Sequence, residues 1–199
     1  MKRTVILMLC VCMLFFAGCS ANPRCEFDEI NKALAEAEWV RCYVYEDESS
    51  YEIDGAAVAT LISGEWEKCG RPDSFHKALS VTVGTQYEIG LFADGKAIVY
   101  CGYAGVFEKD RQYYSYSIES SMDDVAAYLR ENGFRITDDE VHGSGEGKLY
   151  DAPGGNEIGV LSETGTAFRS GKRGDGWCKL EYNGETVFAL DADVAAKAE

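Results

Sequence analysis

The sequence lacks the short motifs that mark several common catalytic and metal sites. It contains no GxSxG motif of a serine hydrolase and no HExxH motif of a zinc protease. None of its eight cysteines forms a CxxC pair, which argues against a zinc ribbon or a thioredoxin-type redox site. Histidine is scarce too, since only His76 and His142 occur. The sequence therefore predicts no metal ion, no cofactor and no catalytic residues.

Basic residues are also few. The chain has 19 Lys and Arg against 34 Asp and Glu, which gives a formal net charge of −15 at pH 7. Proteins bind nucleic acid largely by neutralising phosphates with Lys and Arg, so this balance argues against a nucleic-acid partner. The same negative charge repels anionic lipid head groups and anionic wall polymers. Any hold on a membrane must therefore come from another source.

The first 18 residues have the parts of a secretory signal peptide. Lys2 and Arg3 form a positive start, and residues 4–16 form an apolar run that is short for a membrane-spanning helix. Ala17 and Gly18 are small, as a signal peptidase requires. The alternative is an uncleaved membrane anchor, but small residues follow the run instead of a charged stop-transfer cluster. We therefore predict export.

The end of this segment, FAGC at residues 16–19, resembles the bacterial lipobox, in which a small residue precedes a lipidated cysteine. The resemblance implies cleavage after Gly18 and acylation of Cys19, for example with palmitate. Each buried acyl CH₂ contributes roughly 0.8 kcal/mol, so two or three chains hold a protein on a bilayer. Cleavage also removes Lys2 and Arg3, which takes the formal charge from −15 to −17. The expected location is extracytoplasmic, with the lipid as the link to the bacterial membrane.

The cysteines that remain after this processing are odd in number. They are Cys25, Cys42, Cys69, Cys101 and Cys178. An exported protein can carry disulfides, but an odd count leaves at least one cysteine free or paired between molecules. Cys42 and Cys101 fall on inward faces of predicted strands, where they form either buried free thiols or a cross-strand disulfide. The sequence does not decide the connectivity.

Residues 26–135 predict an α+β domain, with an antiparallel sheet and two or three helices. Apolar residues recur at helical spacing within 26–37, and they alternate with polar residues within the strand pattern at 39–46. Ser121 precedes a helix pattern that has acidic residues in its first turn. This helix is predicted over 120–133, and another over 56–63. Further strands are predicted at 51–54, 78–84, 87–92, 97–103 and 113–118.

The composition then changes. Residues 136–146 are acidic and rich in glycine and serine, which predicts a linker. Residues 147–199 contain short apolar pieces between turn signals, which predicts a small all-β barrel. Asn183-Gly184 is a typical type I′ hairpin turn. The predicted organisation is a signal peptide at 1–18, a tether at 19–25, the α+β domain at 26–135, the linker at 136–146 and the barrel at 147–199.

The C-terminal segment resembles a bacterial SH3 (SH3b) domain in the order of its motifs. These are Leu149-Tyr150, APGG at 152–155, IGVL at 158–161, Gly165-Thr166, GWCKL at 176–180, YNG at 182–184 and VFAL at 187–190. The resemblance implies an SH3-like barrel that binds a wall peptide, a glycan or an envelope protein. The candidate ligand-binding residues are Tyr150, Phe168 and Trp177. The alternative is that Trp177 only packs on the barrel.

SH3b modules often accompany wall hydrolases, so the resemblance also raises a catalytic role. A cysteine peptidase needs a thiolate beside a histidine, and Cys101 with His76 is the nearest candidate pair. The acidic clusters Asp123-Asp124 and Asp138-Asp139-Glu140 suit a calcium site or paired carboxylates. The alternatives are a helix N-terminus for the first cluster and a solvated linker for the second. The tyrosines of residues 113–116 suit a recognition face or a sheet beside the core. We predict a non-enzymatic envelope lipoprotein, with a part in wall remodelling as the alternative.

Overall fold

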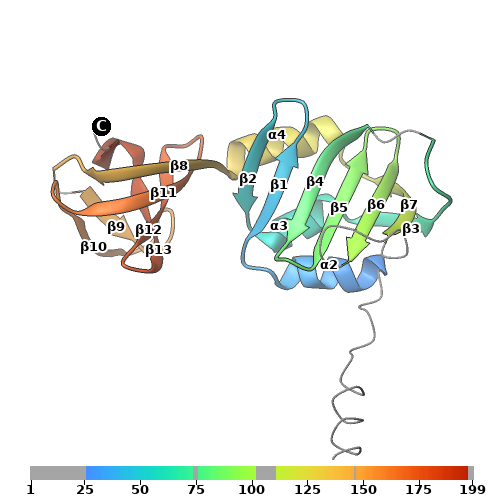
Figure 1. Ribbon diagram of the computed structural model, residues 1–199, viewed down its shortest axis with the longest axis horizontal. Helices are drawn as coiled ribbons and strands as arrows, with labels where there is room; N and C mark the ends of the chain where they lie inside the picture. The colour runs from blue at the N-terminus through green and yellow to red at the C-terminus, as the bar shows by residue number, and fades with distance from the viewer. Residues whose placement is uncertain (1–25, 74–75, 102–110, 146, 197–199) are drawn as a thin grey trace, which may run out of the picture.

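The computed structural model describes residues 26–73, 76–101, 111–145 and 147–196. The predicted signal peptide, the tether and the lipidation site at Cys19 lie outside these residues. Among the described residues, no helix is long and apolar enough to cross a membrane. The described chain forms two lobes, an N-terminal lobe up to residue 133 and a C-terminal lobe from residue 134 onward (Figure 1).

All described strands belong to one antiparallel sheet of 14 strands. The N-terminal lobe contains β1 (Val40–Val44), β2 (Ser49–Ile53), β3 (Gly64–Lys68), β4 (Lys77–Val83), β5 (Tyr87–Phe92), β6 (Lys96–Cys101) and β7 (Arg111–Ile118). The C-terminal lobe contains β8 (Phe134–Gly143), β9 (Gly147–Tyr150), β10 (Glu157–Leu161), β11 (Thr166–Lys172), β12 (Trp177–Tyr182), β13 (Glu185–Leu190) and β14 (Val194–Ala196). The spatial order is β10-β9-β13-β12-β11-β8-β2-β1-β4-β5-β6-β7-β3, with β14 paired to β8.

The helices of the N-terminal lobe lie on one face of its strands and leave the other face uncovered by helices (Figure 1). Apolar side chains such as Ile30 and Leu34 recur at helical spacing and are fully buried under the sheet. Ser121 and Asp124 form a reciprocal capping box that satisfies two backbone N–H groups. The helices are α2 (Phe27–Glu36), α3 (Gly55–Leu61) and α4 (Met122–Asn132), and a short 3₁₀ helix, η3 (Asp191–Asp193), follows β13.

Each lobe has its own hydrophobic core. The core of the N-terminal lobe lies between the helices and the sheet and includes Ile30, Leu34, Val81, Ile89, Leu91 and Leu129. The core of the C-terminal lobe includes Val141, Leu149, Leu161, Cys178, Leu180 and Ala189. Since these are separate clusters, the lobes are joined by strand β8 and by side chains at the junction between them.

The predicted fold class is wrong. We expected an α+β domain followed by a separate small SH3-like barrel, with a linker over residues 136–146. Instead, one open antiparallel sheet of 14 strands continues through both lobes. The described residues contain only three short α-helices. The C-terminal strands therefore belong to the same sheet as the N-terminal strands and do not form an independent barrel.

Strand β8 is the physical reason for this error. Its acidic residues and glycine are typical of a solvated linker. Most of the residues in the predicted linker nevertheless form this strand. Its start pairs with β2, and its remainder pairs with β11 and β14. Asp138 and Glu140 are exposed, while Val141 on the opposite face is buried in the core. The acidic side chains thus mark the outer face of a strand.

Several local predictions are confirmed. The helix expected at 26–37 is α2, and the strand expected at 39–46 is β1, whose first, third and fifth residues are buried. Asn183 and Gly184 have φ angles of 54° and 81° and join β12 to β13, as a type I′ turn requires. Strand β3 was not expected, because its only inward residue is Trp66 and charged residues surround it.

Candidate binding site

Tyr150 and Trp177 meet on the outer face of the C-terminal lobe. Their rings pack edge to face, with centroids 5.2 Å apart and an interplanar angle of 85°. Along β12, Cys178 and Leu180 point into the core, so the alternation of the strand turns Trp177 outward. Both aromatic side chains are half-buried and keep part of their surface open to solvent. Two of the three predicted ligand-binding residues therefore lie together.

The third predicted residue, Phe168, lies apart from this pair. It sits in β11 opposite Glu140 on β8 and Glu181 on β12, and 41% of it is exposed. Glu181 is four residues beyond Trp177, which is about 13 Å along an extended strand. The structure therefore does not bring Phe168 into the site of Tyr150 and Trp177.

An aromatic cluster at the lobe junction continues the same outer face. Phe188 on β13 lies directly opposite Tyr150 on β9. Its ring packs against Phe134 at 5.6 Å and Trp39 at 6.2 Å, and the rings of Trp39 and Phe134 are 5.9 Å apart. Such pairs each contribute about 0.5–1.5 kcal/mol beyond the burial of their area. The N-terminal lobe thus covers one end of the aromatic face that carries Tyr150 and Trp177.

A buried ion pair reinforces this junction. The Lys179 ammonium lies 2.7 Å from Glu52 Oε2 and 4.5 Å from the centroid of the Trp39 ring. Lys179 is only 6% exposed, so its charge depends on these two partners. Arg41 Nη2 lies 3.5 Å from the other carboxylate oxygen of Glu52. One carboxylate therefore connects a cation from each lobe.

Sequence reasoning missed the junction residues. The alternation of β12 places Lys179 on the same outward face as Trp177, which predicts a lysine in solvent. Its partner Glu52 is 127 residues away in the chain. A contact between residues so far apart in the chain leaves no local pattern in the sequence. The sequence predicts Trp39 only as the first residue of a strand.

A groove in the N-terminal lobe runs past Trp39. It consists of two adjoining cavities that share Trp39 and Gly84. The larger has a volume of about 480 Å³ and lies between the end of α2 and the turn from β4 to β5. The smaller has a volume of about 300 Å³, and Arg41, Glu52 and Thr82 line it. No pattern in the sequence marks these residues as candidates for binding.

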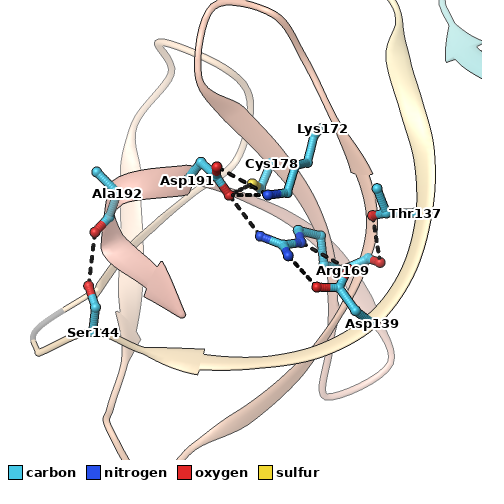
Figure 2. A network of polar contacts seen from close by, with 8 residues as sticks. All are labelled: Thr137, Asp139, Ser144, Arg169, Lys172, Cys178, Asp191 and Ala192. Carbon is cyan, nitrogen blue, oxygen red and sulfur yellow. Dashed lines mark hydrogen bonds and ion pairs between the residues drawn. The ribbon is translucent and has the colours of Figure 1, made fainter. Parts of the chain in front are cut away.

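A network of charged and polar groups lies within the C-terminal lobe (Figure 2). The Arg169 guanidinium donates to both carboxylate oxygens of Asp139, and its Nη1 lies 2.7 Å from Asp191 Oδ1. Asp191 also accepts from Lys172 and from the Cys178 thiol. The Arg169 side chain is only 8% exposed.

This cluster has the chemistry of a structural brace. The hydrogen bonds of Arg169 hold the pKa of Asp139 below its usual value, so this carboxylate stays charged. Burial alone would raise the pKa of Asp191, but hydrogen bonds from Cys178 and Lys172 outweigh it and lower the pKa. Because each charge already has a partner, the cluster ties β8, β11 and η3 together.

The buried thiols do not provide a nucleophile at neutral pH. Burial raises the pKa of Cys42 to about 12. Burial and the hydrogen bond to Asp191 raise the pKa of Cys178 to about 12 as well. Cys101 is disulfide-bonded, with a partner outside the described residues. The hypothesis of a Cys101–His76 pair therefore lacks the thiolate that it needs.

The remaining candidates have structural positions. Asp123 and Asp124 lie in the first turn of α4, where Asp124 belongs to the capping box. Tyr114 is buried, and Tyr116 packs against the core with Trp66, as expected for a sheet beside its core. His142 belongs to β8 and not to a linker. In the part of the chain that the structure describes, no group of three or more His, Cys, Asp or Glu has the arrangement of a metal site.

Comparison with known proteins adds no relative. No family model matches the chain, and neither a curated protein nor a solved structure matches it. The resemblances to a lipobox and to an SH3b domain thus stay predictions from the sequence. The candidate sites rest on their own geometry, namely the Tyr150–Trp177 pair and the groove along Trp39.

Proposed function

We propose that the protein is a lipid-anchored, extracytoplasmic binding protein of a bacterial envelope. Its ligand is a wall peptide, a glycan or an envelope protein, and Tyr150 and Trp177 are the residues that bind it. The observation that carries this proposal is the edge-to-face pair of half-buried aromatic residues on the outer face of the C-terminal lobe. Rigid aromatic side chains lose little entropy on binding and dominate many binding sites.

The disulfide at Cys101 supports both the location and the binding role. Disulfides persist in oxidising compartments such as the extracytoplasmic space, which agrees with the predicted signal peptide. The same bond removes the one cysteine for which a catalytic role was considered. We therefore favour binding over catalysis, and the lipid at Cys19 would keep the protein within reach of the membrane.

Co-sedimentation with insoluble wall peptidoglycan tests the binding site. The protein used is the chain without its signal peptide, carrying Cys19→Ala so that it stays in solution. We expect Trp177→Ala and Tyr150→Ala each to weaken binding at least about tenfold, as removal of a central aromatic contact does.

Phe168→Ala is the matched control, because it removes an exposed aromatic ring from the same lobe but outside the pair. We expect it to change binding less than about twofold, a difference of under 0.5 kcal/mol. If all three variants lose binding equally, the Tyr150–Trp177 pair is not the site. If the chain that carries only Cys19→Ala does not sediment with peptidoglycan, a wall ligand is excluded.

A further inference from the structure

The groove along Trp39 has no part in the site proposed above. We propose that it is a second binding site, specific for a neutral carbohydrate. A sugar ring would lie against the Trp39 indole, and its hydroxyl groups would bind the polar side chains that line the adjoining cavity. This gives the N-terminal lobe a function of its own, and it does not depend on Tyr150 and Trp177.

The polar side chains form a row across three strands. Arg41 on β1 lies directly opposite Glu52 on β2 and Thr82 on β4. With neighbouring strands about 4.8 Å apart, the row extends over roughly 10 Å. The carboxylate accepts hydrogen bonds, the guanidinium donates them and the hydroxyl does both. Sugar hydroxyls also donate and accept, so each finds a partner along this row.

The junction contacts hold these groups in place before a ligand binds. Glu52 is fixed by Lys179 at 2.7 Å and by Arg41 at 3.5 Å. The Trp39 ring is fixed by Phe134 and by the Lys179 ammonium. Trp39 lines both cavities. A preorganised aromatic surface beside oriented polar groups is the arrangement that binding sites require.

The charges of the groove favour a neutral ligand. Arg41 and Glu52 carry opposite charges close together, and Glu36 adds a further carboxylate to the lining. The whole chain has a formal charge of −15. An anionic polymer would therefore be repelled from this lobe, whereas a ligand without charge would not.

The strands beneath the groove disfavour an extended peptide. Peptides are often captured by adding a strand to a free sheet edge. Strand β1 lies between β2 and β4, and β4 lies between β1 and β5, so both already have hydrogen-bonded neighbours on each side. Recognition in the groove must come from side chains, which suits a ring with hydroxyl groups.

Titration with the soluble oligosaccharide chitotetraose tests the proposal, with tryptophan fluorescence and indole N–H signals as readouts. We expect a saturable change in the chain without its signal peptide, carrying Cys19→Ala. Arg41→Ala removes a side chain that is 59% exposed and should weaken binding about tenfold. Thr82→Val keeps the shape and should weaken binding about fivefold through the lost hydroxyl.

Arg135→Ala is the control, because Arg135 is an exposed arginine on the same sheet that does not line the groove. It should leave the affinity unchanged. The proposal is overturned if no saturable change occurs up to about 10 mM probe, which corresponds to an affinity too weak for specific binding. It is also overturned if Arg41→Ala and Thr82→Val bind as well as Arg135→Ala. Because peptidoglycan also contains a glycan, the substitutions separate the two sites: Trp177→Ala leaves the groove intact, and Arg41→Ala leaves the Tyr150–Trp177 pair intact. Failure of one proposal therefore leaves the other result standing.

Discussion

The three free thiols among the described residues differ in their access to water. Cys42 and Cys178 are fully buried, whereas Cys69 is partly exposed at the end of β3. A thiol reacts as its thiolate, and burial raises the pKa of Cys42 and Cys178 to about 12. Reactivity toward a disulfide reagent therefore reports directly on the packing of single residues.

We predict one fast-reacting thiol in the folded protein at about pH 8, where a buried thiol stays protonated. It should disappear in Cys69→Ser, and the reactions of Cys42 and Cys178 should appear only after unfolding in urea. A spectrophotometric titration with a chromogenic disulfide measures this. Equal rates for all thiols in the folded state would show that the two cores are not packed as described.

Arg169 is the central residue of the charged cluster in the C-terminal lobe, since it contacts both Asp139 and Asp191. Arg169→Met leaves Asp139 and Asp191 without their shared cation, and loss of these charge-assisted hydrogen bonds should cost about 2 kcal/mol. Urea unfolding followed by circular dichroism measures the change. Arg169→Lys should recover only part of the loss, because one ammonium cannot bind both carboxylates as the guanidinium fork does.

The ion pair between Arg169 and Asp139 makes the stability of the fold depend on pH. The pKa of Asp139 is lowered in the folded state, so its contribution to stability is present above its unfolded pKa of about 3.9 and is lost as pH falls through the folded pKa. The free energy of unfolding of the wild type should therefore fall below about pH 4, more steeply than that of Arg169→Met. Parallel pH profiles for the two proteins would contradict the role given to Arg169.

At the scale of elements, the junction between β2, β8, β12 and β13 holds the lobes together. Only two residue pairs join β2 to β8, namely Tyr51 with Arg135 and Glu52 with Phe134. The rest of the junction consists of aromatic contacts and the Lys179–Glu52 ion pair. Side chains therefore contribute much of the coupling between the two cores.

The two halves of that ion pair should respond differently to substitution. Glu52→Gln leaves a buried ammonium at Lys179 without its counter-ion and should cost about 2 kcal/mol. Lys179→Met removes the charge, keeps the apolar stem and should cost less than about 1 kcal/mol. Urea unfolding compares the two variants. Equal losses would mean that the pair is solvated and not buried.

Elements with a strong local pattern were predictable from the sequence, and elements defined by distant pairing were not. Ile30 and Leu34 specify α2 by their spacing alone, and Asn183-Gly184 specifies the β12–β13 turn by backbone preference. Strand β8 has few apolar residues and owes its structure to neighbours far away in the chain. The Trp39 groove escaped prediction for the same reason, since it is assembled from separate strands and a turn.

At the scale of the whole molecule, the cysteine count and the proposed processing lead to one disulfide. Cys101 is disulfide-bonded, and Cys42, Cys69 and Cys178 are free. Processing at the lipobox would remove the two cysteines of the signal peptide and modify Cys19. Cys25 is then the one remaining partner for Cys101.

We therefore predict a Cys25–Cys101 peptide pair in a proteolytic digest of the exported protein analysed without reduction. The pair should separate on addition of a reductant, and Cys25→Ser should leave Cys101 able to react with a thiol reagent. A disulfide from Cys101 to Cys42, Cys69 or Cys178 would refute this pairing.

The intact mass of the protein extracted from bacterial membranes is the most direct test of lipid anchoring, because export and anchoring determine every ligand that the protein can meet. We predict a chain that begins at Cys19 and carries the added mass of a diacylglyceryl group, whereas Cys19→Ala carries no such mass. A membrane-extracted chain that retains its first 18 residues, or one that begins at Cys19 without acyl mass, would contradict it.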